Sequence, residues 1–195
     1  QAEDGIRDAQ ESRGLGDVNK RQGKTSPAAD WMRALAAEEH ERCGGPGVGA
    51  VGMCFTGGFA LAMATDERML APVVAQPSLP GALTPRLAHS IDVSPEDLRT
   101  VVARCERGLD VMGVRFCGDR MSPASRFRFL RELLGDSFLA IEIPDSAANP
   151  ESPLPTPHSP LTVDLIDAPG EPTHDALTEV LEFLATRLGL VPGDR

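Results

Sequence analysis

Short apolar runs alternate with helical stretches along most of this chain, and this alternation constrains its fold more than any other feature. Each apolar run has the length of a strand buried on both faces, and each intervening stretch has the spacing or the capping residues of a helix. Strands are predicted over Val48–Met53, Ala71–Ala75, Leu109–Phe116 and Phe138–Ile143, and helices over Pro27–Cys43, Phe55–Ala64, Pro95–Cys105, Pro123–Leu134 and Thr173–Leu188. Such an alternation predicts an α/β fold with a mostly parallel sheet and helices on both faces.

The expected helix starts have a common chemistry. A serine precedes a proline at Ser26, Ser94 and Ser122, which suits a hydroxyl cap followed by proline in the first turn, and Thr173 is expected to cap the last helix. A proline-rich loop over Pro144–Pro160 is long enough to suggest a function.

The domain organisation follows from length and pattern. A chain of 195 residues is enough for one domain with its own core. Residues 1–24 have scattered apolar residues and no period of a helix or a strand, which predicts a disordered or poorly packed tail. Residues 25–195 are expected to form the single domain.

Charge excludes several classes of partner. The chain has 19 Lys and Arg against 29 Asp and Glu, a formal net charge of −10, which opposes binding to nucleic acid or to an anionic membrane. The first residues are polar and acidic and no apolar run reaches the ~20 residues of a membrane span, so the chain is expected to be cytoplasmic. Its four cysteines form no CxxC pair and are expected to be free thiols, with no metal site and no cofactor.

A glycine pattern, Gly47-x-Gly49-x-x-Gly52, matches the dinucleotide-binding consensus. That consensus needs a strand before its first glycine and a helix that starts within it. Here a helix precedes the glycines and the strand lies inside them, so we interpret them as loop-to-strand and packing positions.

The segment from Gly52 to Gly58 has the pattern of a nucleophile elbow, since an apolar strand ends in Gly-x-Cys and a helix follows at once. In such a turn the nucleophile, here Cys54, is strained, and the residues two positions away must be small. Gly52 meets this requirement and Thr56 meets it in part. The turn favours the thiolate and lets the Phe55 N–H donate to an oxyanion. The alternative is a buried, unreactive core cysteine.

Possible partners for Cys54 follow later strands in the order acid, then base. Asp119 comes directly after the third predicted strand, where a carboxylate can orient an imidazole, although a simple turn aspartate would look the same. His158 lies in the proline-rich loop after the fourth strand, where flanking prolines restrict the backbone. Its alternative interpretation is a solvent-exposed loop histidine.

With these residues in place, the chain resembles the dienelactone hydrolase family of α/β-hydrolases, whose members use a Cys-Asp-His triad. The resemblance covers roughly residues 25–190 and rests on Gly52–Leu61, Leu70–Val73 with Gln76-Pro77, Gly113–Asp119 with Pro123 and Arg126-Phe127, and His158–Thr162. The chain departs from the family at Thr56, where many members have glycine. It also has no counterpart of the strands that precede the elbow, so an α/β-hydrolase-like sheet with truncated N-terminal strands is expected.

The resemblance implies a hydrolase of small esters or lactones that needs no cofactor. Cys54 would attack the carbonyl, His158 would shuttle the proton, and Asp119 would orient His158. The second oxyanion donor would be missing, which leaves the Phe55 N–H and implies slow turnover.

Two other functions remain open at this stage. One is a truncated, non-catalytic relative that acts as a binding module, and the other is an acidic, flavodoxin-like nucleotide binder. The resemblance also implies that the strand Val48–Met53, whose neighbour in the family comes from the missing front strands, lies at an uncharged sheet edge. Such an edge predicts a homodimer, aggregation or coverage by the Pro27–Cys43 helix.

Overall fold

The computed structural model describes residues 26–190, so the predicted tail over residues 1–24 lies outside this range. Its elements are, in chain order, α2 (Pro27–Cys43), β1 (Val48–Met53), the 3-10 turn η1 (Cys54–Thr56), α3 (Gly57–Met63), β2 (Met69–Ala75), α4 (Pro85–Ala88), α5 (Pro95–Cys105), β3 (Val111–Phe116), α6 (Ala124–Leu134), η2 (Gly135–Ser137), β4 (Phe138–Ile143), η3 (Asp145–Ala147) and α7 (Pro172–Arg187).

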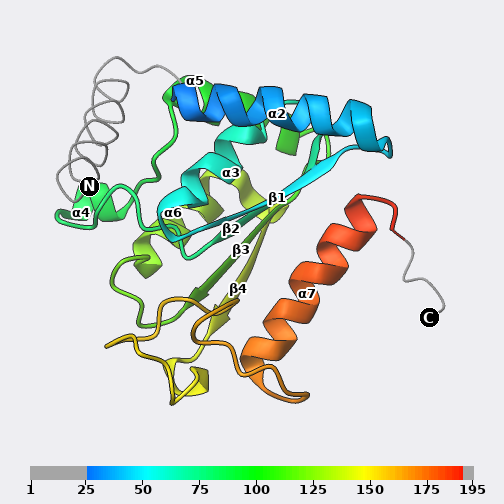
Figure 1. The fold of residues 1–195 in the computed structure, drawn as a ribbon. Helices are drawn as coiled ribbons and strands as arrows, with labels where there is room; N and C mark the ends of the chain where they lie inside the picture. Colours follow the sequence, from blue (N-terminus) through cyan, green and yellow to red (C-terminus); the bar gives the residue numbers. More distant parts are fainter. Residues whose placement is uncertain (1–25, 191–195) are drawn as a thin grey trace, which may run out of the picture.

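The four strands form one sheet in the order β1-β2-β3-β4, and each neighbouring pair is parallel. Helices α3, α5 and α6 connect successive strands and lie on one face, whereas α7 crosses the opposite face (Figure 1). Each new strand is added on the same side of the previous strand, and parallel connections are right-handed. The connecting helices therefore lie on the same face of the sheet. The predicted α/β class, with a parallel sheet between helices, is confirmed.

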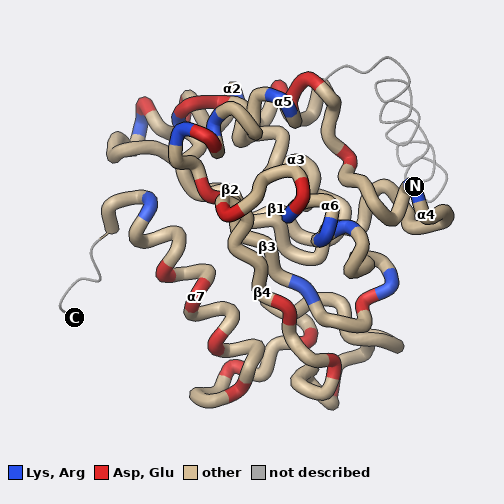
Figure 2. The backbone as a smooth tube through the Cα atoms, turned by 180° about the vertical axis from the view of Figure 1, so that it is seen from behind, with Lys and Arg blue, Asp and Glu red and all other residues tan. Residues whose placement is uncertain are grey.

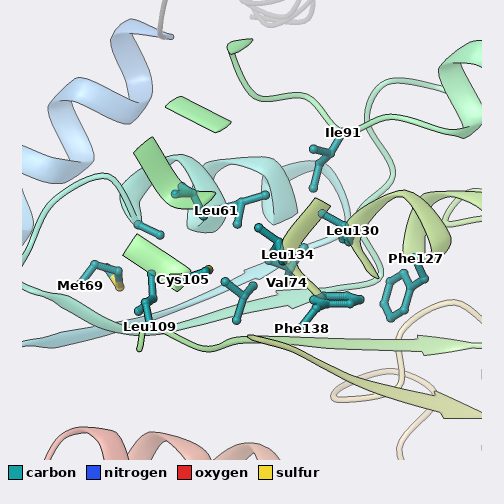
Figure 3. Close-up of a cluster of buried hydrophobic side chains, with 13 residues drawn as sticks. Leu61, Met69, Val74, Ile91, Cys105, Leu109, Phe127, Leu130, Leu134 and Phe138 are labelled. Carbon is teal, nitrogen blue, oxygen red and sulfur yellow. The ribbon is translucent and has the colours of Figure 1, made fainter. Parts of the chain in front are cut away.

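Two hydrophobic clusters fill the spaces between sheet and helices. Val73 and Val74 are adjacent in β2, point to opposite faces and are both fully buried. Val74 belongs to the cluster under α3, α5 and α6, where Phe127 and Phe138 pack edge to face (Figure 3). Val73 belongs to the cluster under α7. Burial on both faces explains why the strands have apolar runs without alternation.

Several helix starts differ from expectation. Ser26 and Ser94 do cap α2 and α5, with Ser94 Oγ accepting from the Asp97 N–H at 3.0 Å. Pro123, and not Ser122, is the residue before α6, because both backbone groups of Ser122 are engaged in the preceding turn. Thr173 lies inside α7, which begins at Pro172, and its hydroxyl accepts instead from the Ile166 N–H.

Acidic residues lie along α7 and on α2, with basic residues between them on α2 (Figure 2). Within residues 26–190, no helix is both long enough and apolar enough to cross a membrane.

Strand β1 lies at the edge of the sheet and pairs only with β2 among the described strands. Helix α2 packs on α3, and Val51 and Met53 are 41% and 36% exposed, so coverage of this edge by α2 was a wrong expectation. Strand β1 has no charged residue, and uncharged edges pair readily with other strands.

We therefore expect concentration-dependent association through β1. The variant Val51→Lys places a charge on the edge of the sheet. It should weaken the free energy of association by about 1 kcal/mol or more, which lowers the association constant several-fold. Light scattering coupled to size-exclusion chromatography measures the change. Leu83→Lys is the matched control, because Leu83 is 89% exposed in the loop after β2 and not on β1. Equal association of both variants would contradict pairing through β1.

Candidate active site

Cys54 lies at the carboxyl end of β1, at the tight turn into α3. Its φ is +52°, a left-handed conformation that is strained for a residue with a side chain. A Cβ at Gly52 would lie 2.4 Å from the Thr56 carbonyl oxygen and 2.8 Å from the Ala60 Cβ. The backbones therefore pass so closely that only glycine fits two residues before the cysteine. These are the geometric requirements of a nucleophile elbow.

Thr56, two residues after Cys54, helps to close the same turn. Its hydroxyl accepts from the Met53 N–H at 3.0 Å and donates to the Met53 carbonyl at 2.9 Å. The threonine therefore stabilises the turn from which Cys54 projects, and its side chain has a role that a glycine could not fill.

His158 and Asp119 form a buried pair at the same end of the sheet. Nδ1 of His158 donates to Oδ2 of Asp119 at 2.7 Å, and both side chains are less than a tenth exposed. The other carboxylate oxygen accepts from the backbone N–H groups of Met121 and Ser122 at 2.9 and 3.2 Å. His158 is therefore not a solvent-exposed loop histidine. Asp119 does close the turn before α6, as a simple turn aspartate would, and with its second oxygen it also binds the imidazole.

The turn that presents Asp119 is held from two sides. The Gly118 N–H donates to Oδ1 of Asp145 at 2.7 Å, and a Cβ at Gly118 would lie 2.0 Å from the other oxygen of that carboxylate, so a larger residue here would displace the Asp145 side chain. The fully buried Arg115 donates to the carbonyls of Cys117 at 2.7 Å and Ser122 at 2.8 Å. The position of the carboxylate is therefore set by groups from β3 and from the loop after β4.

Asp164 gives the His158 loop its shape. Its Oδ2 accepts from the backbone N–H groups of His158 at 2.9 Å and Ser159 at 2.7 Å, and the side chain is buried. Sequence reasoning missed Asp164, because an aspartate six residues after a loop histidine matches no recognised spacing.

The remaining ring nitrogen of His158, Nε2, is buried without a hydrogen-bond partner among the described residues. The imidazole lies close enough to Cys54 for each group to shift the pKa of the other. Nε2 is therefore the nitrogen left to exchange a proton at the sulfur.

The charges favour a thiolate beside an imidazolium. Burial lowers the pKa of His158, but the hydrogen bond and charge of Asp119, together with the nearby Cys54 sulfur, outweigh burial and raise it to about 9. Burial raises the pKa of Cys54, but the hydroxyl of Ser78, the nearby His158 imidazole with its charge, and the Phe55 N–H together outweigh burial and lower it. A lowered thiol pKa is the usual basis of cysteine reactivity.

Phe55 completes the predicted set. Its side chain is 49% exposed, and its backbone N–H faces the sulfur. The structure thus brings together Cys54, Asp119, His158 and the Phe55 N–H.

The pattern Gly47-x-Gly49-x-x-Gly52 lies at and within β1, with no helix starting inside it. This is the geometry of a strand and not of a dinucleotide-binding turn. Within residues 26–190, no group of three or more His, Cys, Asp or Glu side chains is placed to hold a metal ion.

A cavity of about 340 Å³ lies at the opposite, amino ends of the strands and is lined by Glu67, Leu70, Arg104, Arg107, Gly108, Leu109 and Arg187. Its arginines are already engaged: Arg107 pairs with Glu67 at 2.8 Å, Arg187 pairs with Asp110, and Arg104 binds backbone carbonyls. The charges here stabilise the fold, and the reactive groups lie at the other end of the sheet.

Near neutral pH, iodoacetamide should alkylate Cys54 before the other thiols, at least about threefold faster than exposed Cys43 and Cys117. The reason is the lowered pKa of Cys54. Buried Cys105, whose pKa burial raises, should react last. Peptide mass spectrometry after brief labelling measures the order. Faster labelling of Cys43 or Cys117 would identify Cys54 as an unreactive cysteine.

Comparison with known proteins gave no match. No protein-family model, no curated protein and no solved structure matches the chain.

Proposed function

We propose that this protein is a cysteine-dependent hydrolase of small esters or lactones, of the dienelactone hydrolase kind within the α/β-hydrolases, and that it acts in the cytoplasm without a cofactor. The observation that carries the proposal is the buried His158–Asp119 pair, whose free ring nitrogen adjoins a cysteine at a strained strand-to-helix turn. That combination of nucleophile, base and orienting carboxylate is the functional unit of acyl transfer.

In the first half of the reaction, the thiolate of Cys54 attacks the carbonyl carbon and a C–S bond forms. The carbonyl oxygen becomes an oxyanion, which the Phe55 N–H stabilises. The oxyanion then collapses, the bond from carbon to the leaving oxygen breaks, and the imidazolium of His158 donates its Nε2 proton to that oxygen. The products are an alcohol, a thioester on Cys54 and a neutral imidazole.

In the second half, neutral His158 takes a proton from water as the water oxygen attacks the thioester. The second oxyanion collapses, the C–S bond breaks and the thiolate leaves, beside the imidazolium that has just formed. Asp119 keeps Nδ1 protonated throughout, so that Nε2 is always the nitrogen that exchanges a proton. With the Phe55 N–H as the one oxyanion donor identified among residues 26–190, turnover is expected to be slow, because each such donor contributes ~10²–10³ in rate.

The direct test is to trap the acyl-enzyme. Mixing the protein with p-nitrophenyl acetate should release a burst of up to one p-nitrophenolate per chain and leave an acetyl group on Cys54, identified by peptide mass spectrometry. Protein pretreated with iodoacetamide should give no burst. A burst that survives this treatment, or acetylation of Cys43 or Cys117 in place of Cys54, would overturn the proposal. Reactive Cys54 without an acyl-enzyme would favour a non-catalytic binding module.

A further inference from the structure

Ser78 contacts Cys54 at two places. It lies in the loop after β2, and β2 is the strand that pairs with β1. The Ser78 N–H donates to the Cys54 carbonyl at 3.0 Å, and Ser78 Oγ lies 3.4 Å from Cys54 Sγ. The backbone hydrogen bond sets the position of Ser78 beside the elbow, and the hydroxyl then reaches the reactive atom itself.

A hydroxyl suits this position because it is both a donor and an acceptor. When Cys54 is a thiol, its S–H can donate to Ser78 Oγ, which lies 3.4 Å from the sulfur. When Cys54 is a thiolate, rotation of the Ser78 O–H reverses the direction of this hydrogen bond, and the hydroxyl then donates to the sulfur. We propose that Ser78 is a further catalytic residue of this site, whose hydroxyl binds the Cys54 thiolate directly. The catalytic role of Ser78 rests on the proposed function, whereas its contact with the thiolate does not.

The loop that carries Ser78 is held firmly by Arg126 of α6, whose side chain is fully buried. Its guanidinium donates to the carbonyls of Pro77 at 2.5 Å and Ser90 at 2.7 Å, and to that of Pro80. These acceptors lie on both sides of the segment around Ser78. The loop therefore has little freedom to withdraw the hydroxyl from the sulfur.

The same guanidinium connects Ser78 to the rest of the site. Arg126 also donates to the Met121 carbonyl at 3.2 Å, and the Met121 N–H donates to Asp119. One buried cation thus holds the loop of Ser78 and the turn of Asp119 together, which makes Arg126 a positioning residue. His158, which Asp119 orients, also adjoins the sulfur, so the thiolate has a neutral donor and a cationic one.

The hydroxyl acts on both chemical steps. A donor to the sulfur raises the thiolate fraction available for attack, and it also stabilises the thiolate that leaves when the thioester is hydrolysed. Hydrogen bonds to charged groups are stronger than neutral ones, so loss of this one should shift the titration of Cys54 by about one pH unit.

The test is the pH dependence of Cys54 alkylation by iodoacetamide, which does not require ester turnover. Ser78→Ala should raise the midpoint by about one pH unit, a roughly tenfold loss of thiolate below the midpoint. Ser78→Thr keeps a hydroxyl and should restore the midpoint to within ~0.3 unit of the unmodified protein. Ser90→Ala is the matched control, because Ser90 lies beyond α4 in the same connection from β2 to α5 and its hydroxyl donates to the Leu87 carbonyl and not to the sulfur. The substitution keeps the backbone carbonyl that Arg126 binds. Thermal melting of each variant verifies that it is folded.

An unchanged midpoint in folded Ser78→Ala, or an equal shift in Ser90→Ala, would overturn the role of Ser78. The proposed hydrolase activity is judged separately by the acyl-enzyme burst. A shifted midpoint without any burst would support the Ser78–thiolate contact while overturning the hydrolase. A burst with no shift would support the hydrolase and remove Ser78 from its mechanism.

Discussion

Replacement of Cys54 by alanine is expected to abolish ester hydrolysis and to give the largest effect of any single substitution. The remaining His158–Asp119 pair can activate water but cannot form an acyl-enzyme. Loss of the nucleophile from a triad costs roughly 10⁴–10⁶ in kcat, so the variant should hydrolyse p-nitrophenyl acetate at the uncatalysed rate. Initial rates of p-nitrophenolate release measure the change.

Cys43→Ala is the control for Cys54→Ala. Cys43 is an exposed free thiol at the end of α2, so its loss should leave kcat within about twofold of the unmodified value. Cys54→Ala should also keep its melting temperature within a few degrees, because the side chain is half-buried and alanine keeps the backbone of the elbow. Retention of turnover in folded Cys54→Ala would exclude cysteine catalysis at this site.

Asp119→Asn is expected to lower kcat by roughly 10²–10⁴-fold with little change in KM. The asparagine amide can occupy the same space, but it no longer provides the negative charge that favours the imidazolium. It can also present an N–H to Nδ1, which favours the wrong ring tautomer. The geometry is therefore kept while the proton transfer fails.

The same variant should change the pH profile in a defined direction. Protonation of the leaving oxygen needs the imidazolium of His158, whose pKa is raised to about 9, so activity should fall as the pH rises through that value. The hydrogen bond and the charge of Asp119 both contribute to the raised pKa, so in Asp119→Asn the alkaline limb should move to lower pH. Asp175→Asn, an exposed position in the first turn of α7, should change neither kcat nor the profile. An alkaline limb that stays in place would show that Asp119 does not control His158.

The sheet could be predicted because its determinants are local. Strand β4 has the predicted bounds Phe138–Ile143, and Ser94 caps its helix as expected, since apolar runs and capping hydroxyls act over a few residues. The predicted caps at Ser122 and Thr173 were wrong for the opposite reason. Contacts outside the helix compete with capping at both positions. Thr173 Oγ1 accepts from the Ile166 N–H in the loop before α7. Ser122 Oγ is buried without a partner among the described residues, while the Ser122 carbonyl accepts from the Arg115 guanidinium.

The candidate site also has residues that local sequence could predict and residues that it could not. Cys54 could be singled out from its neighbours, because a strained turn needs glycine beside it within the same few residues. Asp119 and His158 could be singled out by their places after successive strands, because the carboxyl ends of parallel strands meet at one edge of a sheet. In each case the chain itself contained the spacing on which the prediction depended.

Ser78, Asp164 and Arg126 have no such local signal, and only the tertiary structure decided their roles. The Ser78 hydroxyl meets a sulfur 24 residues away, and the Arg126 guanidinium meets a carbonyl 49 residues away. Hydrophobic periodicity reports which residues are buried and in which element, whereas a buried polar contact depends on how loops from different strands pack together. The sequence by itself therefore determined the parallel sheet and identified the candidate cysteine, acid and base at one edge of it. Packing decided which polar groups hold them and which hydroxyl reaches the sulfur, because those contacts exist only once distant segments have come together.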